Sequence, residues 1–186
     1  MEKVNVYDWD KTIFPKDSTV TFYFWCVRHW PRVLRALPAA IRLLPAYWKK
    51  KVTKTAIKEA FYGFLRYVPD IDNAAERFWN EHFPRINGWY LEQQRSDDIV
   101  ISASPEFLIS IPAKRLGVRL LASRVDKFTG KTEGENCWGP EKVNRLREAY
   151  PEVEIAAFYS DSYSDTPLAE LADRAWLVKG QELLPW

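Results

Sequence analysis

The stretch that decides the fold is MEKVNVYDWDKT, at residues 1–12. A short β-branched apolar run leads there directly into Asp8 and Asp10. Side chains alternate between the two faces of a strand, so both carboxylates should point the same way where a buried strand ends. Two carboxylates this close resist joint ionisation unless a cation, a proton or a division of roles relieves them. The pair therefore predicts a nucleophile beside a general acid or base, together with a metal ion.

A D-x-D-x-T pattern alone could also be the start of a polar loop, so the prediction depends on partners further along the chain. The second segment begins at Asp98 and has an apolar run at 99–101 that leads into Ser102 and Ser104, followed by a Pro-Glu pair typical of a helix start. A hydroxyl and free backbone N–H groups at such a point can hold an anion. An ordinary helix N-cap at Ser104 is the alternative, and the two interpretations are compatible.

Two more segments complete the pattern. Lys142 follows a Gly-Pro-Glu sequence and lies in the first turn of a predicted helix. A lone lysine is usually a solvated charge, and it matters only if the fold brings it to the carboxylates. Further on, an apolar run at 155–159 ends in an acidic loop with Asp161 and Asp165. These two are one helical turn apart, and acidic clusters at strand ends bind hard cations through oxygen.

In this order the segments resemble the four motifs of the haloacid dehalogenase (HAD) superfamily of phosphohydrolases. The matching positions are residues 8–12, Ser102, Lys142, and Asp161 with Asp165. The resemblance is nearest to the phosphoserine-phosphatase-like branch. Within it, the strings ISASPEFL, CWGPEKV and YSDSYSD are similar to the phosphatidylglycerophosphatase C-like group. Two glycines usual in the family are replaced here, one by Lys11 and one by Ser160, which affects the expected loop geometry.

The resemblance implies a mechanism and a cofactor. Asp8 would attack phosphorus to form an aspartyl-phosphate, while Asp10 would protonate the leaving oxygen and later deprotonate water. Mg²⁺ would be held by Asp8, the backbone carbonyl of Asp10, and Asp161. The groups implied to bind phosphate are Ser102, Ala103 and Lys142. Thr12 and Asp165 are implied to lie next to the metal ligands and to support them. The second aspartate argues against the dehalogenase branch, in which no acid is needed to protonate a halide.

The spacing of the elements predicts an α/β fold, with a doubly wound parallel sheet in a Rossmann-like HAD-type core. The expected strands are at 3–8, 98–102, 118–122, 154–159 and 175–178, and the expected core helices are at 105–116 and 140–149. The core would comprise residues 1–14 and 96–186. A helical cap, at 15–95, would be inserted after the first strand. Within 124–138, the Thr129-Gly130 pair between short alternating segments predicts a β-hairpin.

The cap region carries a second pattern, an apolar stripe at alternating spacings of three and four. Its members are Val20, Tyr23, Val27, Trp30, Leu34, Leu37, Ile41, Leu44 and Trp48. Prolines at 31, 38 and 45 predict kinks or separate helical segments. Residues 18–58 contain nine Arg or Lys residues and no Asp or Glu. The stripe could pack within a helical bundle that leaves the basic residues in water, or it could lie on anionic lipid and admit a lipid phosphate.

Composition sets wider limits. A chain of 186 residues can hold one α/β core and one insertion, and its net charge of +2 gives no reason to expect a nucleic-acid partner. Two distant cysteines, Cys26 and Cys137, suit a reducing compartment. No secretory signal and no apolar run of the roughly 20 residues needed to span a membrane are visible. We therefore expect a cytoplasmic protein, peripheral at the inner membrane surface if the cap meets lipid.

The sequence as a whole predicts a Mg²⁺-dependent phosphomonoester hydrolase that works through an aspartyl-phosphate. The expected partner is a phosphorylated small molecule or lipid phosphate, with an anionic lipid or other amphiphilic phosphate first. Three alternatives stay open at this stage. They are a phosphatase of a small soluble metabolite such as phosphoserine, a phosphotransferase that uses an acceptor other than water, and a non-catalytic binding module.

Overall fold

The centre of the molecule is a six-stranded sheet in a computed structural model that describes residues 3–186. The strands run in the order β3-β2-β1-β4-β5-β6, and all pair in parallel except β6, which is antiparallel to β5. Their bounds are Lys3–Tyr7 for β1, Ile99–Pro105 for β2, Arg119–Ser123 for β3, Glu154–Ser160 for β4, Ala172–Lys179 for β5 and Glu182–Pro185 for β6. The chain builds outward on both sides of β1, so the carboxyl end of β1 lies at the topological switch point, where open α/β sheets bind ligands.

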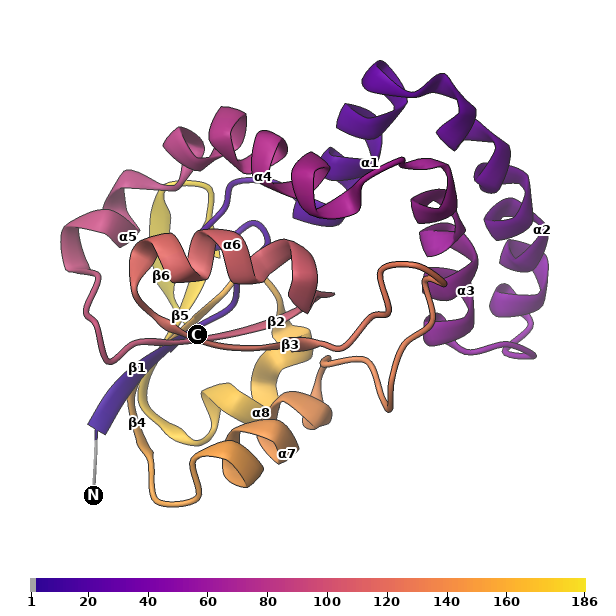
Figure 1. Ribbon diagram of the computed structural model, residues 1–186. Coiled ribbons are helices and arrows are strands. Elements are labelled where there is room, and N and C mark those ends of the chain that lie inside the picture. Colours follow the sequence, from indigo (N-terminus) through magenta and orange to yellow (C-terminus); the bar gives the residue numbers. More distant parts are fainter. Residues whose placement is uncertain (1–2) are drawn as a thin grey trace.

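Helices cover both faces of this sheet (Figure 1). Helix α6 (Glu106–Leu116) lies on one face, and α7 (Pro140–Ala149) and the short α8 (Thr166–Ala169) lie on the other. The apolar strands β1, β2 and β4 fill the space between these layers, with side chains such as Val6, Ile101 and Phe158 fully buried. The predicted α/β doubly wound sheet is confirmed, and the five expected strands and two expected core helices occur at nearly the predicted residues.

The predicted hairpin at 124–138 is reduced to a single antiparallel bridge, between Val125 and Thr132. The loop contacts the inserted region instead. A Cβ atom on Gly130 would lie 2.8 Å from the Cβ of Tyr62, and the backbone N–H of Thr132 donates to Glu59 over 2.8 Å. The sheet's antiparallel hairpin is the one that joins β5 to β6. Residues 124–138 therefore act as a brace between the core and the inserted helices.

The region inserted after β1 is helical, as predicted. Its elements are α1 (Ser18–His29), η1 (Pro31–Ala36), α2 (Leu37–Trp48), α3 (Lys54–Tyr62), η2 (Gly63–Tyr67), α4 (Ile71–His82), η3 (Phe83–Arg85) and α5 (Gly88–Gln93). The prolines divide it as expected, because Pro31 begins η1 and Pro38 lies in the first turn of α2. Proline is tolerated in a first turn, where its missing N–H would have no intrahelical partner. Pro45 lies inside α2.

Helices α4 and α5 lie against the sheet beside α6, whereas α2 and α3 stand away from it (Figure 1). The ring of Trp79 on α4 meets Trp9 edge-on at 5.6 Å between centroids, and its indole N–H donates to the carbonyl of Leu108 over 2.7 Å. On α5, the ring of Tyr90 meets Tyr7 at 4.9 Å. The cap boundaries at 15 and 95 stay a prediction. No helix within residues 3–186 combines the length and the apolar character needed to cross a membrane.

The apolar stripe of the inserted region divides into two parts. Its first part is internal, since the ring of Tyr23 packs against Phe61 and Phe64 at 5.0 and 5.2 Å between centroids. Its second part, on η1 and α2, includes the exposed side chains of Leu34 and Trp48. The bundle interpretation therefore describes the first part of the stripe and leaves the second part unexplained.

Candidate active site

The carboxyl end of β1 carries Asp8, whose backbone N–H extends the ladder by donating to the carbonyl of Tyr159 over 2.8 Å. Its side chain is buried and accepts from the ammonium of Lys142 at 2.6 Å. The same ammonium lies 2.7 Å from Asp165. Lys142 reaches both carboxylates because Gly139 turns the chain at φ +58° just before α7, a conformation that favours glycine. The fold thus brings the first, third and fourth motifs into one buried ion-paired cluster.

The cluster buries two carboxyl groups in contact with one ammonium group. Burial raises the pKa of Asp8 to about 7, although Lys142 pulls it down. Burial alone would lower the pKa of Lys142, but the carboxylates of Asp8 and Asp165 outweigh that effect and raise it. Lys142 is therefore a permanent cation at neutral pH, fixed between two acids and only 2% exposed. Its position suits it to offset negative charge that develops on Asp8 or on a group bound there.

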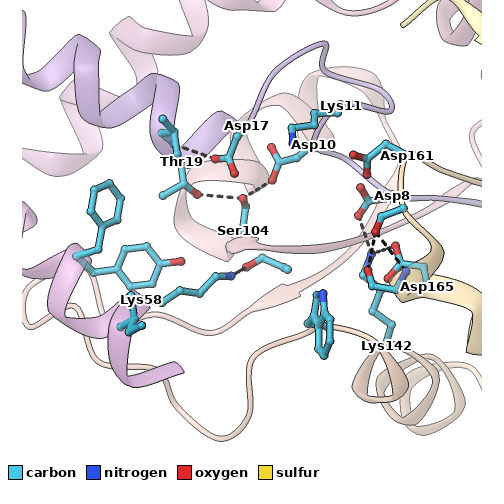
Figure 2. Close-up of a pocket in the computed structure, with 18 residues that line it drawn as sticks. Asp8, Asp10, Lys11, Asp17, Thr19, Lys58, Ser104, Lys142, Asp161 and Asp165 are labelled. Carbon is cyan, nitrogen blue, oxygen red and sulfur yellow. Dashed lines mark hydrogen bonds and ion pairs between the residues drawn. The ribbon is translucent and has the colours of Figure 1, made fainter. Parts of the chain in front are cut away.

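Asp10 faces the same cavity and is held by hydroxyl groups (Figure 2). One oxygen accepts from the backbone N–H of Ser18 at 2.7 Å and from its hydroxyl at 2.5 Å, and the other accepts from Ser104 at 2.5 Å. Burial raises the pKa of Asp10 to about 6, with a further contribution from Asp17, while these donors oppose the rise. A carboxyl group near neutrality can give a proton in one step and accept one in the next.

The predicted helix cap at Ser104 is wrong. Residue Pro105 occupies the N-cap position of α6 without a side-chain hydrogen bond, and the Ser104 hydroxyl is bonded to Asp10 and Thr19 instead. Ser102 is fully buried, and its hydroxyl accepts from the backbone N–H of Ser104 at 3.1 Å. Ala103 and Ser104 line the cavity, and Ser102 lies behind them. The phosphate-binding roles given to Ser102 and Ala103 stay predictions.

Lys11, at the position where the resemblance leads one to expect glycine, takes up a backbone conformation that favours glycine. Lys11 has φ +59°, a left-handed conformation that costs a non-glycine residue roughly 1–2 kcal/mol. The lysine also lines the cavity, next to Asp161. Burial raises the pKa of Asp161, and the positive charge of Lys11 is the largest influence in the other direction. Lys11, one of the two residues that depart from the family pattern, therefore adds a cation to the wall of the cavity.

The donor set that the sequence implies for Mg²⁺ fits this place. Asp8 and Asp161 both line the cavity and offer hard oxygen ligands, and the second carboxylate oxygen of Asp165 is buried without a hydrogen-bond partner in the described part of the chain. A bound cation would favour the charged forms of Asp8 and Asp161, whose pKa values burial raises. Within residues 3–186, no three His, Cys, Asp or Glu side chains form a metal site by themselves, so a backbone carbonyl such as that of Asp10 would be needed.

The remaining predicted residue, Thr12, is buried behind the site. Its carbonyl accepts from the side-chain amide of Asn87 at 2.6 Å, which ties the loop after β1 to the start of α5. Its hydroxyl has no hydrogen-bond partner among the described residues. Thr12 thus occupies a supporting position, and any effect on a metal ion stays a prediction.

The cavity has a volume of about 420 Å³ and lies between the core and the inserted helices (Figure 2). Its core side is charged, and its other side is mainly apolar and aromatic. That second side is formed by Val20, Ile57, Phe61 and Tyr62, together with the polar residues Asp17, Thr19 and Lys58, and Trp138 adds one aromatic ring from the core. Lys58 reaches from α3 to the core, where its ammonium donates to the carbonyl of Ala103 and to Asn136, both at 2.8 Å.

The structure therefore brings Asp8, Asp10, Lys142, Asp161 and Asp165 together. Sequence reasoning missed the polar residues that the inserted helices supply, which are Ser18, Thr19 and Lys58. A signal existed for the first two, because they begin a helix soon after the first motif, and a helix start offers donors to a carboxylate. No sequence signal distinguishes Lys58 from its basic neighbours.

A sequence profile of the haloacid dehalogenase-like hydrolases matches residues 6–170. The chain belongs to this family of hydrolytic enzymes. The match includes the end of β1, the inserted helices and the segments that carry Lys142 and Asp161, so it contains every residue that lines the cavity. Among curated relatives, Protein CicA from two strains of Caulobacter vibrioides, NA1000 / CB15N and ATCC 19089 / CIP 103742 / CB 15, is 30% identical over 187 residues. The alignment covers 90% of this chain and 82% of each relative.

Solved structures show the same fold at lower identity. A protein of unknown function from Bordetella pertussis Tohama I superposes with a TM-score of 0.72 at 22% identity, covering 94% of this chain and 89% of that one. A structure described as a phospho-aspartyl intermediate analogue of phosphoserine phosphatase superposes with a TM-score of 0.58 at 14% identity, covering 94% and 85%. These likenesses extend over the core and the inserted region together.

Proposed function

We propose that this hydrolase is a Mg²⁺-dependent phosphomonoesterase that works through an aspartyl-phosphate on Asp8. The observation that carries the proposal is the meeting of Asp8, Asp10 and Lys142 at one cavity, with Lys142 bonded to the nucleophile at 2.6 Å. Phosphoryl transfer needs a nucleophile in line with phosphorus, a proton for the leaving oxygen, and positive charge around the phosphoryl group. Each of these is supplied by a residue that faces this cavity.

In the first step, a carboxylate oxygen of Asp8 bonds to phosphorus and the ester P–O bond breaks. Asp10 gives its proton to the departing oxygen, and Lys142 offsets the charge beside Asp8. In the second step, Asp10 takes a proton from water, the water oxygen bonds to phosphorus, and the carboxylate of Asp8 is released with inorganic phosphate. Mg²⁺, when bound by Asp8, Asp161 and the Asp10 carbonyl, supplies positive charge against the phosphoryl oxygens.

The preferred substrate class under this proposal is an amphiphilic phosphate, with a lipid phosphate first. The wall opposite the carboxylates is apolar at Val20, Ile57 and Phe61, and it carries the cation Lys58. An acyl or prenyl group could pack on that wall while its phosphate faces Asp8. The resemblance to the phosphatidylglycerophosphatase C-like group supports the same choice.

A small soluble phosphate is the second candidate, because solved structures of similar fold are described as phosphoserine phosphatase. A phosphoserine-sized ligand requires groups that pair with an ammonium and a carboxylate. Asp17 and Lys58 both line the cavity and carry the required charges. The apolar side chains around them are the reason why we place this candidate second.

The test is a phosphate-release assay with two substrates that share a headgroup, glycerol 3-phosphate and its singly acylated form, lysophosphatidic acid. Phosphoserine is a third substrate. We expect Mg²⁺-dependent turnover with a clear preference for the acylated compound, and none by Asp8→Asn. Preference for phosphoserine or glycerol 3-phosphate would overturn the substrate class. Retained hydrolysis by pure Asp8→Asn protein would overturn the mechanism. A phosphate ester formed when an alcohol acceptor is added would identify a phosphotransferase.

A further inference from the structure

Exposed members of the apolar stripe and two exposed prolines together form an apolar face on η1 and α2. Its apolar members are Leu34, Pro38, Ile41, Pro45 and Trp48, all of them exposed, and we call this set the α2 face. Positions 38, 41, 45 and 48 are separated by three or four residues, which places them on one side of a helix. Ile41 is 52% exposed and Trp48 is 76% exposed.

The opposite side of α2 is the packed side. Ala40 is buried there, and α2 contacts α3 and η1 (Figure 1). Helix α3 in turn supplies Ile57, Lys58 and Phe61 to the cavity. The α2 face is therefore one helix layer away from the candidate active site, on the outside of the molecule.

Exposed basic residues are concentrated in the same part of the chain as the α2 face. Arg28, Arg32, Arg35, Arg42, Lys49, Lys50 and Lys51 are all exposed, and none of them takes part in an ion pair with another described residue. Residues 18–58 contain no acid that could neutralise them. The apolar face therefore belongs to a segment with a local excess of positive charge, although the net charge of the whole chain is only +2.

We propose that the α2 face docks on the surface of an anionic lipid bilayer. An aromatic residue at the headgroup level, aliphatic side chains that enter the acyl boundary, and lysines or arginines that meet anionic headgroups are the three components of interfacial binding. Trp48, Ile41 and Arg42 supply one of each within two turns of α2. The proposal deepens the proposed function, on which its value to catalysis rests, because docking would keep the protein at the surface where amphiphilic substrates collect.

Other occupants fit the α2 face less well. A nucleic acid would engage the arginines and lysines but would leave Leu34, Ile41 and the prolines without apolar partners. A second copy of the chain would bring two clusters of like charge together, which costs free energy. A bilayer rich in anionic lipid satisfies the apolar and the basic components at once.

The experiment measures sedimentation of the full chain with vesicles of phosphatidylglycerol and phosphatidylcholine in equal parts, and with phosphatidylcholine alone. We expect binding to the anionic vesicles that weakens as salt rises, because exposed charges are screened. Changing Arg28, Arg35 and Arg42 together to Gln should weaken binding by roughly a hundredfold, at about fivefold for each residue. The matched control changes Arg85, Arg147 and Arg174 to Gln, which alters net charge equally at exposed sites outside residues 18–58.

The apolar component has its own control. Ile41→Ser should weaken binding, whereas Leu184→Ser, at a site on β6 that is 42% exposed, should not. No binding to anionic vesicles, or equal binding by the α2-face and control variants, would overturn the proposal. Loss of a dimer or of a nucleic-acid complex in the same variants, without vesicle binding, would assign the face to that other partner.

The docking proposal and the phosphatase proposal fail separately. The Arg→Gln variants change no residue that lines the cavity, so hydrolysis of a small artificial phosphate ester without vesicles should be unchanged. Vesicle binding by a protein with no phosphatase activity would leave the docking intact and overturn the proposed function. Full activity without any vesicle binding would overturn the docking proposal and leave the proposed function intact.

Discussion

Replacement of Lys142 by Met should destabilise the protein in a pH-dependent way. The ammonium lies 2.6 Å from Asp8 and 2.7 Å from Asp165, and the side chain is 2% exposed. Methionine keeps most of the length and the apolar stem of lysine but removes the charge. The variant would therefore leave two carboxylates buried without their common cation.

The expected magnitude follows from that geometry. Removal of one partner from a buried ion pair costs about 3–5 kcal/mol, a large part of the roughly 5–15 kcal/mol by which a native domain is stable. The cost depends on pH because Asp8 can take up a proton. Its pKa is already about 7 beside Lys142, and loss of the lysine raises it further, since Lys142 lowers it in the wild type.

The direction of the pH effect is fixed by proton uptake. Consider a pH above 7 but below the raised pKa of Asp8 in the variant. In this range Asp8 is protonated in the folded variant, and it is ionised in the folded wild type and in both unfolded proteins. The stability deficit of the variant should therefore be largest at alkaline pH. It should shrink by up to about 1.4 kcal/mol for each pH unit towards neutrality. Lys142 stays protonated in the wild type across this range, because the two carboxylates raise its pKa.

The measurement is urea unfolding followed by tryptophan fluorescence and circular dichroism, with a chelator present so that metal binding does not contribute. Lys114→Met, at an exposed position on α6, is the matched control and should change stability by no more than about 0.5 kcal/mol. A Lys142→Met protein as stable as the wild type at alkaline pH would refute the reasoning. A deficit that does not change with pH would refute the role of Asp8 in it.

Three further predictions concern the chemistry. Asp8→Asn should fold normally and lose turnover, because an amide cannot attack phosphorus; unfolded protein in circular dichroism would contradict this reading. Asp161→Ala should weaken Mg²⁺ binding in calorimetry more than Asp165→Ala does, and equal affinities would refute the ligand assignment. Ser104→Ala should raise the pKa of Asp10 above about 6, because it removes a donor to the carboxylate. The alkaline limb of the kcat/KM profile should then move to higher pH, and an unmoved limb would show that Asp10 is not the acid it reports.

The core could be predicted from sequence because its signals are local. Apolar runs near 98–101 and 154–159 are long enough to identify buried strands, and parallel strands place their carboxyl ends along one edge. Asp8, Asp10, Lys142 and the fourth-motif acids therefore met as expected once the strands were placed.

The features that could not be predicted depend on contacts between segments that are far apart in the sequence. Ser104 serves Asp10 rather than a helix end because α1 brings Ser18 and Thr19 to the same carboxylate. The segment at 124–138 has the sequence pattern of a hairpin. Its turn at Gly130 packs closely against Tyr62, and the segment forms one bridge followed by a loop. The reach of Lys58 across to Ala103 is likewise a property of how the inserted helices sit.

The brace at 124–138 separates substrate choice from chemistry. It touches the inserted helices through Thr132 on Glu59 and through Gly130 on Tyr62, and Tyr62 is part of the cavity wall. None of the carboxylates proposed to act in catalysis belongs to the brace. A descendant of this enzyme could therefore widen or narrow its cavity by changing the length of one loop, while Asp8, Asp10 and Lys142 keep their positions. The fold in this way offers evolution an adjustment of substrate size that leaves the reaction itself untouched.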